Sequence, residues 1–264
     1  MGIALIAGKG DLPRQIIQAF QEQPLYIVGF RGQTPVDLAP SLKLFPMGHI
    51  GAVLEYLHDN HVKKIVLAGA LRRPSWSELS LDKTGAQWLK KLGWKALKGD
   101  NDILSGILNL LEGEGFEILK PSDILKTLMA SGGCRTLLHP TKQDQQDIQR
   151  GVAVLQALSS HDVGQAIVVQ QGMVLGIEAA EGTASLIKRC GDLKRHGGGG
   201  VLVKIAKTHQ DQRVDLPTIG LETLYQLKEA GFLGVAVSTR TTQILQQDVV
   251  IEKANQLGLF IIGI

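Results

Sequence analysis

Short apolar runs alternate with segments of helical periodicity along the first half of the chain. The runs at residues 3–7, 25–30 and 62–68 predict strands, because each is short, apolar and flanked by turn-forming or polar residues. Residues 14–21 and 49–60 have the spacing of helices. Strands separated by helices are typical of βαβ units and a parallel sheet. Ligands of such sheets bind at the carboxyl ends of the strands.

The pattern changes before the middle of the chain. Residues 102–114 carry apolar side chains at helical spacing, which predicts an amphipathic helix. A polar stretch with glycine and proline follows at 131–146 and has the composition of a linker. We therefore expect one domain at residues 1–130 and a second at residues 147–264.

A second series of strands and helices follows the expected linker. Two apolar runs flank Gln171-Gly172, a pair that favours a hairpin turn. The predicted elements are helices at 145–158, 183–190 (capped by Thr183), 218–230 and 248–256, and strands at 165–170, 173–178, 200–206, 234–238 and 259–264. The whole chain is therefore expected to be α/β, with two α/β domains.

Composition narrows the class of protein. The chain has 264 residues, 44% of them apolar, and a net charge of only +3 with no basic arm, so we expect a globular protein that does not bind nucleic acid. Cys134 and Cys190 have no metal-binding spacing, which fits a reducing compartment. The N-terminal segment lacks the features of a signal peptide, and no apolar run is long enough to span a membrane. We expect a cytoplasmic protein, and a peripheral membrane role stays open.

One stretch departs from this average. All three tryptophans (Trp76, Trp88 and Trp94) fall within residues 72–99, which also hold seven Lys or Arg against two acids. We expect a helix at residues 82–98. Its basic and aromatic residues suit a surface that contacts anionic lipid or admits acyl chains, and core packing of the tryptophans beneath solvated lysines is the alternative.

Glycine and arginine follow the first and third predicted strands. Gly8 and Gly10, followed by Asp11 and Leu12, form a Gly-x-Gly turn before a helix, which suits a phosphate, although Pro13 stands where a dinucleotide fingerprint has its third glycine. A simple tight turn is the alternative. The pair Arg72 and Arg73 could bind phosphate oxygens or surface carboxylates. Asp100 and Asp102 could hold a cation, or Asp102 could cap the helix that follows.

The second half carries the parts that phosphoryl chemistry requires. Glu178 and Glu181 lie between a predicted strand and a predicted helix and are candidate metal ligands. Cations that could offset phosphate charge follow at Lys204, Lys207 and Arg213. Asp215 stands close to Pro217, which we expect to open a helix. Solvated or capping roles for these charged groups are the alternative.

Seven short motifs in this order resemble those of a known family over essentially the whole chain. They lie at residues 8–13, 68–74, 98–101, 162–165, 178–183, 200–204 and 213–220, and the last reads Arg-Val-Asp-Leu-Pro-Thr-Ile-Gly. The series resembles that of the LpxI-type UDP-2,3-diacylglucosamine pyrophosphatases.

The resemblance implies a fold and a reaction. It implies a Rossmann-like N-terminal domain with a parallel sheet, joined by a linker to a smaller C-terminal α/β domain, with the lipid held between the two. It also implies Mg²⁺-dependent hydrolysis of UDP-2,3-diacylglucosamine to 2,3-diacylglucosamine 1-phosphate (lipid X) and UMP in lipid A synthesis of Gram-negative bacteria. Water is expected to add to the lipid-side phosphorus, and the protein is expected to be a homodimer.

The matching positions define the candidate site. Asp215 corresponds to an essential aspartate and either binds Mg²⁺ or positions the attacking water; both roles stay open. The candidate metal ligands are Glu178, Glu181 and Asp215. The candidate substrate-binding residues are Gly8, Gly10, Asp11, Leu12, Arg72, Arg73, Gln165, Thr183, Lys204, Lys207, Arg213 and Thr218.

Two other functions compete with this hypothesis. Arg31 follows the second predicted strand, where an arginine could meet the 2′-phosphate of NADP in an oxidoreductase. A protein that binds a nucleotide sugar or a lipid without catalysis would keep the cations, but it would have no use for the acids between Glu178 and Asp215.

Overall fold

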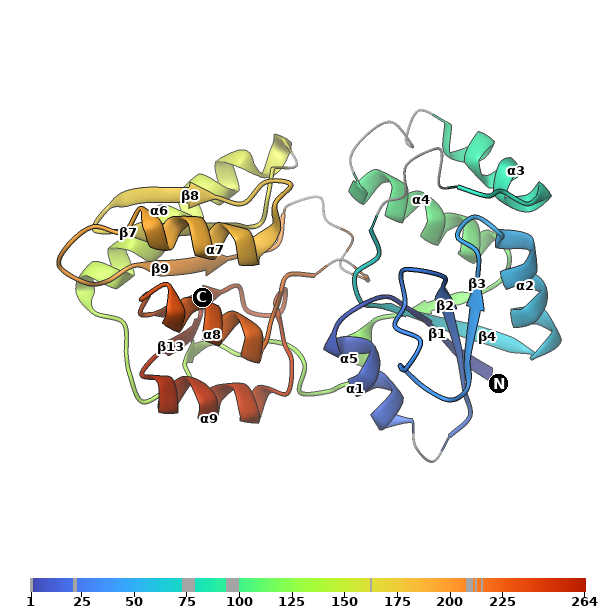
Figure 1. Cartoon of the computed structure of the whole chain (residues 1–264), viewed down its shortest axis with the longest axis horizontal. Coiled ribbons are helices and arrows are strands. Elements are labelled where there is room, and N and C mark those ends of the chain that lie inside the picture. The colour runs from blue at the N-terminus through green and yellow to red at the C-terminus, as the bar shows by residue number, and fades with distance from the viewer. Residues whose placement is uncertain are drawn as a thin grey trace. The chain divides into compact units, whose positions relative to one another are not determined.

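The computed structural model describes residues 2–20, 23–72, 79–93, 100–161, 163–207, 211, 213–214 and 216–264, without the side chains of Asp100 and Asn101. The chain divides into two compact units (Figure 1). Unit 1 comprises Met1–Lys126 and Asp211–Asp215, and unit 2 comprises Thr127–Gln210 and Leu216–Ile264. Two α/β units with a parallel sheet in the N-terminal one confirm the predicted fold class.

The sheet of unit 1 has five parallel strands among the described residues, in the order β3-β2-β1-β4-β5. The strands are β1 (Gly2–Ala7), β2 (Leu25–Phe30), β3 (Leu42–Phe45), β4 (Val62–Ala68) and β5 (Glu117–Leu119). The three strands predicted from apolar runs form the centre of this sheet. The two edge strands were not predicted.

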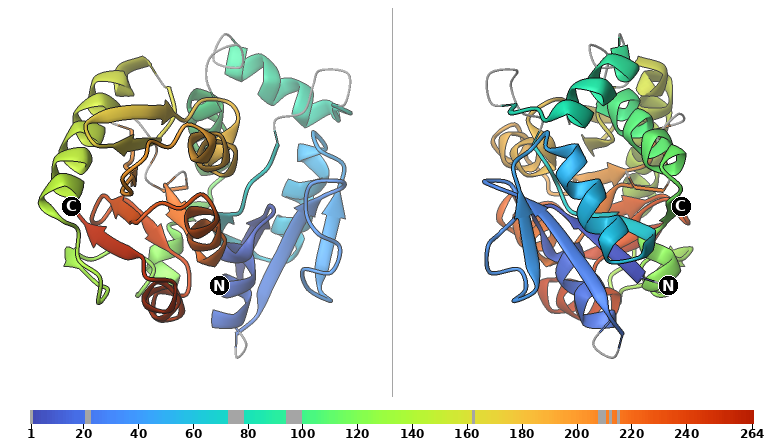
Figure 2. Two further views of the ribbon diagram at one scale, coloured as in Figure 1. Left: turned by 60° about the vertical axis from the view of Figure 1, so that its left-hand side comes forward. Right: turned by 90° about the vertical axis from the view of Figure 1, so that its right-hand side faces the viewer.

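Helices cover both faces of this sheet: α1 (Asp11–Ala19), α2 (Ile50–Asp59), α3 (Lys83–Leu92), α4 (Asp100–Gly113) and α5 (Pro121–Ile124) (Figures 1 and 2). Side chains alternate between the faces along a strand. Leu5 of β1 packs in the cluster that includes α1, whereas Ile6 packs in the cluster that includes α2 and α4. The sheet therefore lies between two apolar layers.

Helix α3 is shorter than the helix predicted at residues 82–98. The carboxylate of Asp82 caps it by accepting the N–H of Gly85 at 2.7 Å, and it ends at Leu92, before Gly93 with a φ of 50°. Trp88 is 4% exposed and belongs to the core, which confirms the core-packing interpretation for this tryptophan. Trp76 and Trp94 lie outside the described residues. Asp102 is inside α4, so its predicted capping role is wrong.

Unit 2 contains a mixed sheet of six strands among its described residues, in the order β6-β13-β11-β9-β7-β8. The strands are β6 (Gly133–Cys134), β7 (Ala166–Gln170), β8 (Met173–Ile177), β9 (Val201–Lys204), β11 (Gly234–Val237) and β13 (Phe260–Gly263). Strands β9, β11 and β13 are parallel, and β6, β7 and β8 pair antiparallel to their neighbours. The predicted hairpin at Gln171-Gly172 is the connection from β7 to β8.

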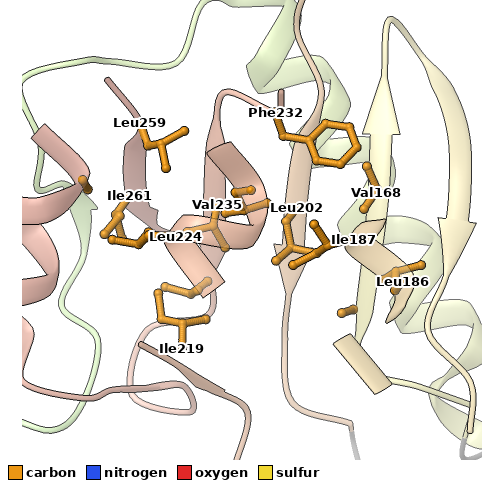
Figure 3. Packing of buried hydrophobic residues seen from close by; sticks show 14 of the residues in the cluster. Val168, Leu186, Ile187, Leu202, Ile219, Leu224, Phe232, Val235, Leu259 and Ile261 are labelled. Atoms are coloured by element: carbon orange, nitrogen blue, oxygen red, sulfur yellow. The ribbon is translucent and has the colours of Figure 1, made fainter. Parts of the chain in front are cut away.

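The helices of unit 2 are α6 (Lys142–Leu158), α7 (Gly182–Asp192), α8 (Leu221–Glu229) and α9 (Gln247–Leu257), and a 3₁₀ turn, η3 (Ser159–His161), follows α6. Helix α6 covers one face of the sheet and the others cover the opposite face. In the second layer Leu186 and Ile187 of α7 and Leu224 of α8 pack against Leu202 and Val235 (Figure 3). None of the described helices is long and apolar enough to cross a membrane.

Three helix starts in unit 2 were predicted wrongly. Helix α6 begins at Lys142 and not at residue 145. Helix α8 begins at Leu221 and not at Thr218, because Thr218–Ile219 forms β10 and pairs in parallel with β12 (Gln243–Ile244). Helix α7 begins at Gly182 after Glu181, so Thr183 lies inside the helix and is not its cap. Both residues are thereby free of helix-start roles, and their polar groups contact Lys204, as described below.

Candidate active site

Lys204 is a buried cation at the carboxyl end of β9. It is 6% exposed, and its Nζ donates hydrogen bonds to Oγ1 of Thr183 and to the carbonyl oxygen of Thr218, both at 3.0 Å. Its position follows from the alternation of β9, which directs the side chain to the face covered by α7. Burial of an ammonium group costs free energy unless polar partners replace water. Thr183 and Thr218 supply such partners.

Glu178 is connected to this cation through the hydroxyl of Thr183. It follows β8, is 6% exposed, and accepts the hydroxyl of Thr183 at 2.7 Å and the backbone N–H of Gln165 at 3.1 Å. Because the hydroxyl proton of Thr183 points to Glu178, a lone pair on Oγ1 is left for Lys204. Glu178, Thr183 and Lys204 therefore form one chain of hydrogen bonds.

Gly164 allows Gln165 to reach Glu178. Its φ is +38°, and a Cβ at this position would overlap the backbone carbonyl of Glu178. No residue with a Cβ fits there without displacing the segment that carries the carboxylate. The motif at residues 162–165 therefore holds Glu178 in place, although Asp162 lies outside the described residues.

The electrostatics of Lys204 follow from its burial. Removal from water lowers the pKa of its ammonium group, and the negative charge of Glu178 opposes that change. The charge of Lys204 has little water around it, so its field acts strongly on an anion bound nearby. A developing negative charge on a phosphoryl oxygen is the kind of charge that such a group stabilises.

Thr218 contributes its backbone to the same cluster. Its carbonyl oxygen binds Lys204, and its hydroxyl lies 3.1 Å from the carbonyl oxygen of Leu216 and 3.2 Å from Oε1 of Gln243. Gln243 is 3% exposed and its N–H donates to the carbonyl of Pro217 at 2.8 Å. Sequence reasoning missed Gln243, because only the pairing of β10 with β12 brings it to this place.

Glu181 does not join this cluster. Its Oε1 accepts from Nη2 of Arg189 at 2.7 Å, and its Oε2 accepts the N–H of Ala179 at 3.1 Å. The guanidinium of Arg189 lowers the pKa of Glu181. The two acids predicted as joint metal ligands therefore have different partners.

The predicted metal ligands are not gathered at one place among the described side chains. Among these residues no group of three or more His, Cys, Asp or Glu is placed to hold a metal ion. Both oxygens of Glu178 and both of Glu181 already accept hydrogen bonds within the protein. Asp215, the third candidate ligand, lies outside the described residues.

Arg213 belongs to unit 1 and pairs with two acids. Its Nη2 lies 2.8 Å from Oδ2 of Asp211, and its Nη1 lies 2.6 Å from Oε1 of Glu112 on α4. These carboxylates raise the pKa of the guanidinium, and Arg213 in turn lowers the pKa of Asp211. Lys207, the other predicted cation, is partly buried in unit 2. The predicted site residues are thus distributed over both units.

The Gly-x-Gly loop of unit 1 is tied to the end of β4. The N–H of Lys9 donates to the carbonyl of Ala70 at 2.8 Å, and the N–H of Ala70 donates back at 2.9 Å. A Cβ on Gly8 would lie 2.5 Å from the Ala70 oxygen, so this glycine is needed for the close approach of the two loops. Leu12 packs against the core on this face. Gly8 therefore has a structural reason in this turn, and its contact with a phosphate stays a prediction.

Gly10 has a different environment. It precedes α1 with a φ of 106°, no side-chain cap is present, and a Cβ there would meet nothing within 4 Å. Asp11 occupies the first turn of the helix. In the neighbouring loop Arg72 is exposed and its N–H donates to Oε1 of Gln33 at 3.0 Å, whereas Arg73 lies outside the described residues. The helix start and Arg72 remain candidates for binding an anion.

The fold places this chain among the two-domain α/β proteins. A unit with a parallel sheet is followed by a unit with a mixed sheet, in which a buried lysine stands at the end of a strand. Family models of the LpxI N-terminal and C-terminal domains match residues 2–128 and 131–262. The chain therefore belongs to the LpxI family. It is 32% identical over 273 residues to UDP-2,3-diacylglucosamine pyrophosphatase LpxI of Caulobacter vibrioides, an alignment that covers 99% of this chain and 97% of the relative.

Proposed function

We propose that this protein hydrolyses the pyrophosphate bond of UDP-2,3-diacylglucosamine to give lipid X and UMP in lipid A synthesis. The carrying observation is the similarity to the Caulobacter pyrophosphatase, which extends over 99% of the chain. The buried cluster of Lys204, Thr183 and Glu178 supports it, because a diphosphate needs fixed positive charge before a nucleophile can approach.

Lys204 has the central role in this proposal. Its ammonium group offsets negative charge on the diphosphate, which is larger in the transition state than in the bound substrate. Glu178 acts on Lys204 through Thr183 and is a positioning residue. Because the ammonium group is held by two oxygen atoms, Oγ1 of Thr183 and the carbonyl oxygen of Thr218, it requires little reorganisation during the reaction.

The proposal also covers the attacking water and the metal ion. We propose that Asp215 binds Mg²⁺ or orients the attacking water, and that the water adds to the lipid-side phosphorus. Turnover is proposed to require Mg²⁺. This ion usually binds one or two carboxylates together with substrate phosphates, so we propose that it binds together with the substrate.

Hydrolysis in ¹⁸O-labelled water tests the reaction and the phosphorus attacked. We expect UMP and lipid X as products, with the label in the phosphate of lipid X, and no products in excess EDTA until Mg²⁺ is restored. Label in UMP would overturn the assigned phosphorus. Unchanged turnover in EDTA would overturn the magnesium requirement. No hydrolysis under any condition would favour a protein that only binds its ligand.

Replacement of Asp215 tests the assigned residue. Asp215→Ala is expected to reduce turnover by about a thousandfold, in the range typical for loss of a group that acts in the transition state, with substrate binding retained. Asp248→Asn, which removes an acid from the start of α9, is the control and keeps wild-type turnover. Near-normal turnover of Asp215→Ala would contradict the site.

The proposed substrate also determines where the protein acts. A diacylated sugar nucleotide stays in a membrane, so we propose a cytoplasmic protein that binds peripherally to the inner membrane. We further propose a homodimer, which sedimentation equilibrium at micromolar concentration tests directly.

A further inference from the structure

Unit 1 contains an apolar cavity of about 530 Å³. It lies between helices α2, α3 and α4 and the face of the sheet that they cover. Ile6, Phe30 and Leu67 line it from β1, β2 and β4, close to the carboxyl ends of these strands. The cavity therefore lies at the end of the sheet where parallel α/β folds bind their ligands.

The chemistry of the walls restricts the ligand. Every described residue that lines the cavity is aliphatic, aromatic, methionine or glycine, so the walls carry no charged or hydroxyl side chain. The volume is within the range of about 300–1,000 Å³ that small-molecule sites occupy. Such walls cannot satisfy the hydrogen bonds of a sugar or a nucleotide. They suit a hydrocarbon.

The polar loops of unit 1 begin next to this cavity. Ile6 precedes the Gly8–Gly10 turn by two residues, and Leu67 precedes Gly69 by the same distance. Leu71, which also lines the cavity, directly precedes Arg72. A ligand with a hydrocarbon tail in the cavity would thus carry its polar end toward Gly10 and Arg72. The arrangement fits an amphiphile with an anionic head.

We propose that this cavity binds one acyl chain of the substrate; the assignment rests on the function proposed above. If a methylene group takes about the same volume as a water molecule, ~30 Å³, the cavity has room for one long chain. Chain length is then measured by the depth of this cavity.

Helix α3 forms one wall of the cavity. Leu89 and Leu92 line it, whereas Gln87, Lys90 and Lys91 of the same helix are exposed. The start of α3 is fixed to the start of α2, because the carboxylate of Asp82 accepts both the N–H of Gly85 and the N–H of Ala52, the latter at 3.3 Å. A larger side chain at position 89 would therefore reduce the volume of the cavity.

Leu89→Trp tests this assignment, and Gln87→Trp is the matched control on the exposed side of α3. Each buried methylene strengthens binding by about fourfold, so wild-type protein should prefer tetradecanoyl over decanoyl chains by about 200-fold in kcat/KM. We expect Leu89→Trp to reduce this preference at least tenfold and to keep turnover of butanoyl substrate. Gln87→Trp should keep the full preference. Equal loss on all chain lengths, or an unchanged preference, would overturn the proposal.

A binding experiment separates this proposal from the proposed reaction. N-phenyl-1-naphthylamine fluoresces in apolar sites, so wild-type protein should enhance its emission and Leu89→Trp should enhance it far less. Lipid X should displace the probe, and glucosamine 1-phosphate should not. If the probe binds and is displaced but no UMP is ever released, the reaction is wrong and the cavity assignment stands. If UMP is released but Leu89→Trp leaves the probe unaffected, the cavity assignment is wrong.

Discussion

Nζ of Lys204 lies 3.0 Å from Oγ1 of Thr183, which joins the end of β9 to the first turn of α7. The same hydroxyl donates to Glu178 at 2.7 Å, so its proton is committed to the acid and a lone pair faces the amine. A threonine inside a helix thereby links a buried cation to a buried carboxylate.

Thr183→Val tests this link with a side chain of nearly equal volume. The variant leaves polar groups of Glu178 and Lys204 without a partner, so we expect the free energy of unfolding to fall by about 1–3 kcal/mol and turnover to fall at least tenfold. Urea denaturation and UMP release measure the two effects. Thr183→Ser keeps the hydroxyl and should restore most of the turnover. Equal loss in both variants would argue against the hydroxyl.

The buried charge of Lys204 makes stability depend on pH. Burial lowers its pKa below the ordinary value of 10.5, so between the folded-state pKa and 10.5 the unfolded chain binds the extra proton. The free energy of unfolding should therefore rise with pH in that window, by up to about 1.4 kcal/mol per pH unit. Below the folded-state pKa, Lys204 should no longer make it depend on pH.

Lys204→Gln isolates this effect. Subtracting the urea-derived unfolding free energy of the variant from that of the wild type, at several pH values up to 10.5, should give a difference that increases with pH. Lys188→Gln removes an exposed lysine of α7 and should follow the wild-type profile. A difference that is flat or decreases would contradict the burial-induced shift.

Gly164 belongs to the motif that holds Glu178 in place, and Gly172 serves as its control. Both have positive φ, +38° and +74°, but only Gly164 has a backbone carbonyl, that of Glu178, where a Cβ would stand. Gly172→Ala should cost about 1 kcal/mol from backbone strain. Gly164→Ala should cost at least about 3 kcal/mol and also lower turnover. Thermal melts and UMP release measure stability and turnover. If the two variants behaved alike in both, the argument would be refuted.

The exposed lysines of α3 are expected to contact anionic lipid. Each basic residue near such a surface contributes about 1 kcal/mol, so the double variant Lys90→Glu/Lys91→Glu should bind phosphatidylglycerol vesicles at least tenfold more weakly. Lys63→Glu/Lys142→Glu changes the net charge equally at other exposed positions and serves as the control. If both variants bind the vesicles equally well, this surface does not contact the membrane. The proposed reaction does not depend on that result.

The central strands of unit 1 were predictable because residues 25–30 and 65–68 are apolar runs that are mostly buried. The edge strands were not. Strand β5 has only three residues, and β3 has Lys43 exposed in its middle, so neither gives an apolar signal. Thr218 was predicted to start a helix because Pro217 favours such a start, yet pairing with Gln243 decided otherwise. Pairing partners distant in sequence leave no local trace.

The same limit applies to the site. Glu178, Thr183 and Lys204 were identified by residue type and order, and the structure brings them together. The separation of Glu181 from Glu178 was not predictable, since it depends on Arg189, about two turns further along α7. Gly164 was visible in its motif, but its role follows only from the position of the Glu178 carbonyl.

The short segment that carries Arg213 gives the chain an unusual connectivity. Residues 211–215 are assigned to unit 1 although the chain on both sides belongs to unit 2, and Arg213 binds Glu112 of α4. A gene fragment that ends at Lys126 would therefore encode an N-terminal half that lacks a piece of itself. Exchange of one half alone would break the pairing of Arg213 with Glu112, so the two halves are expected to have been inherited together.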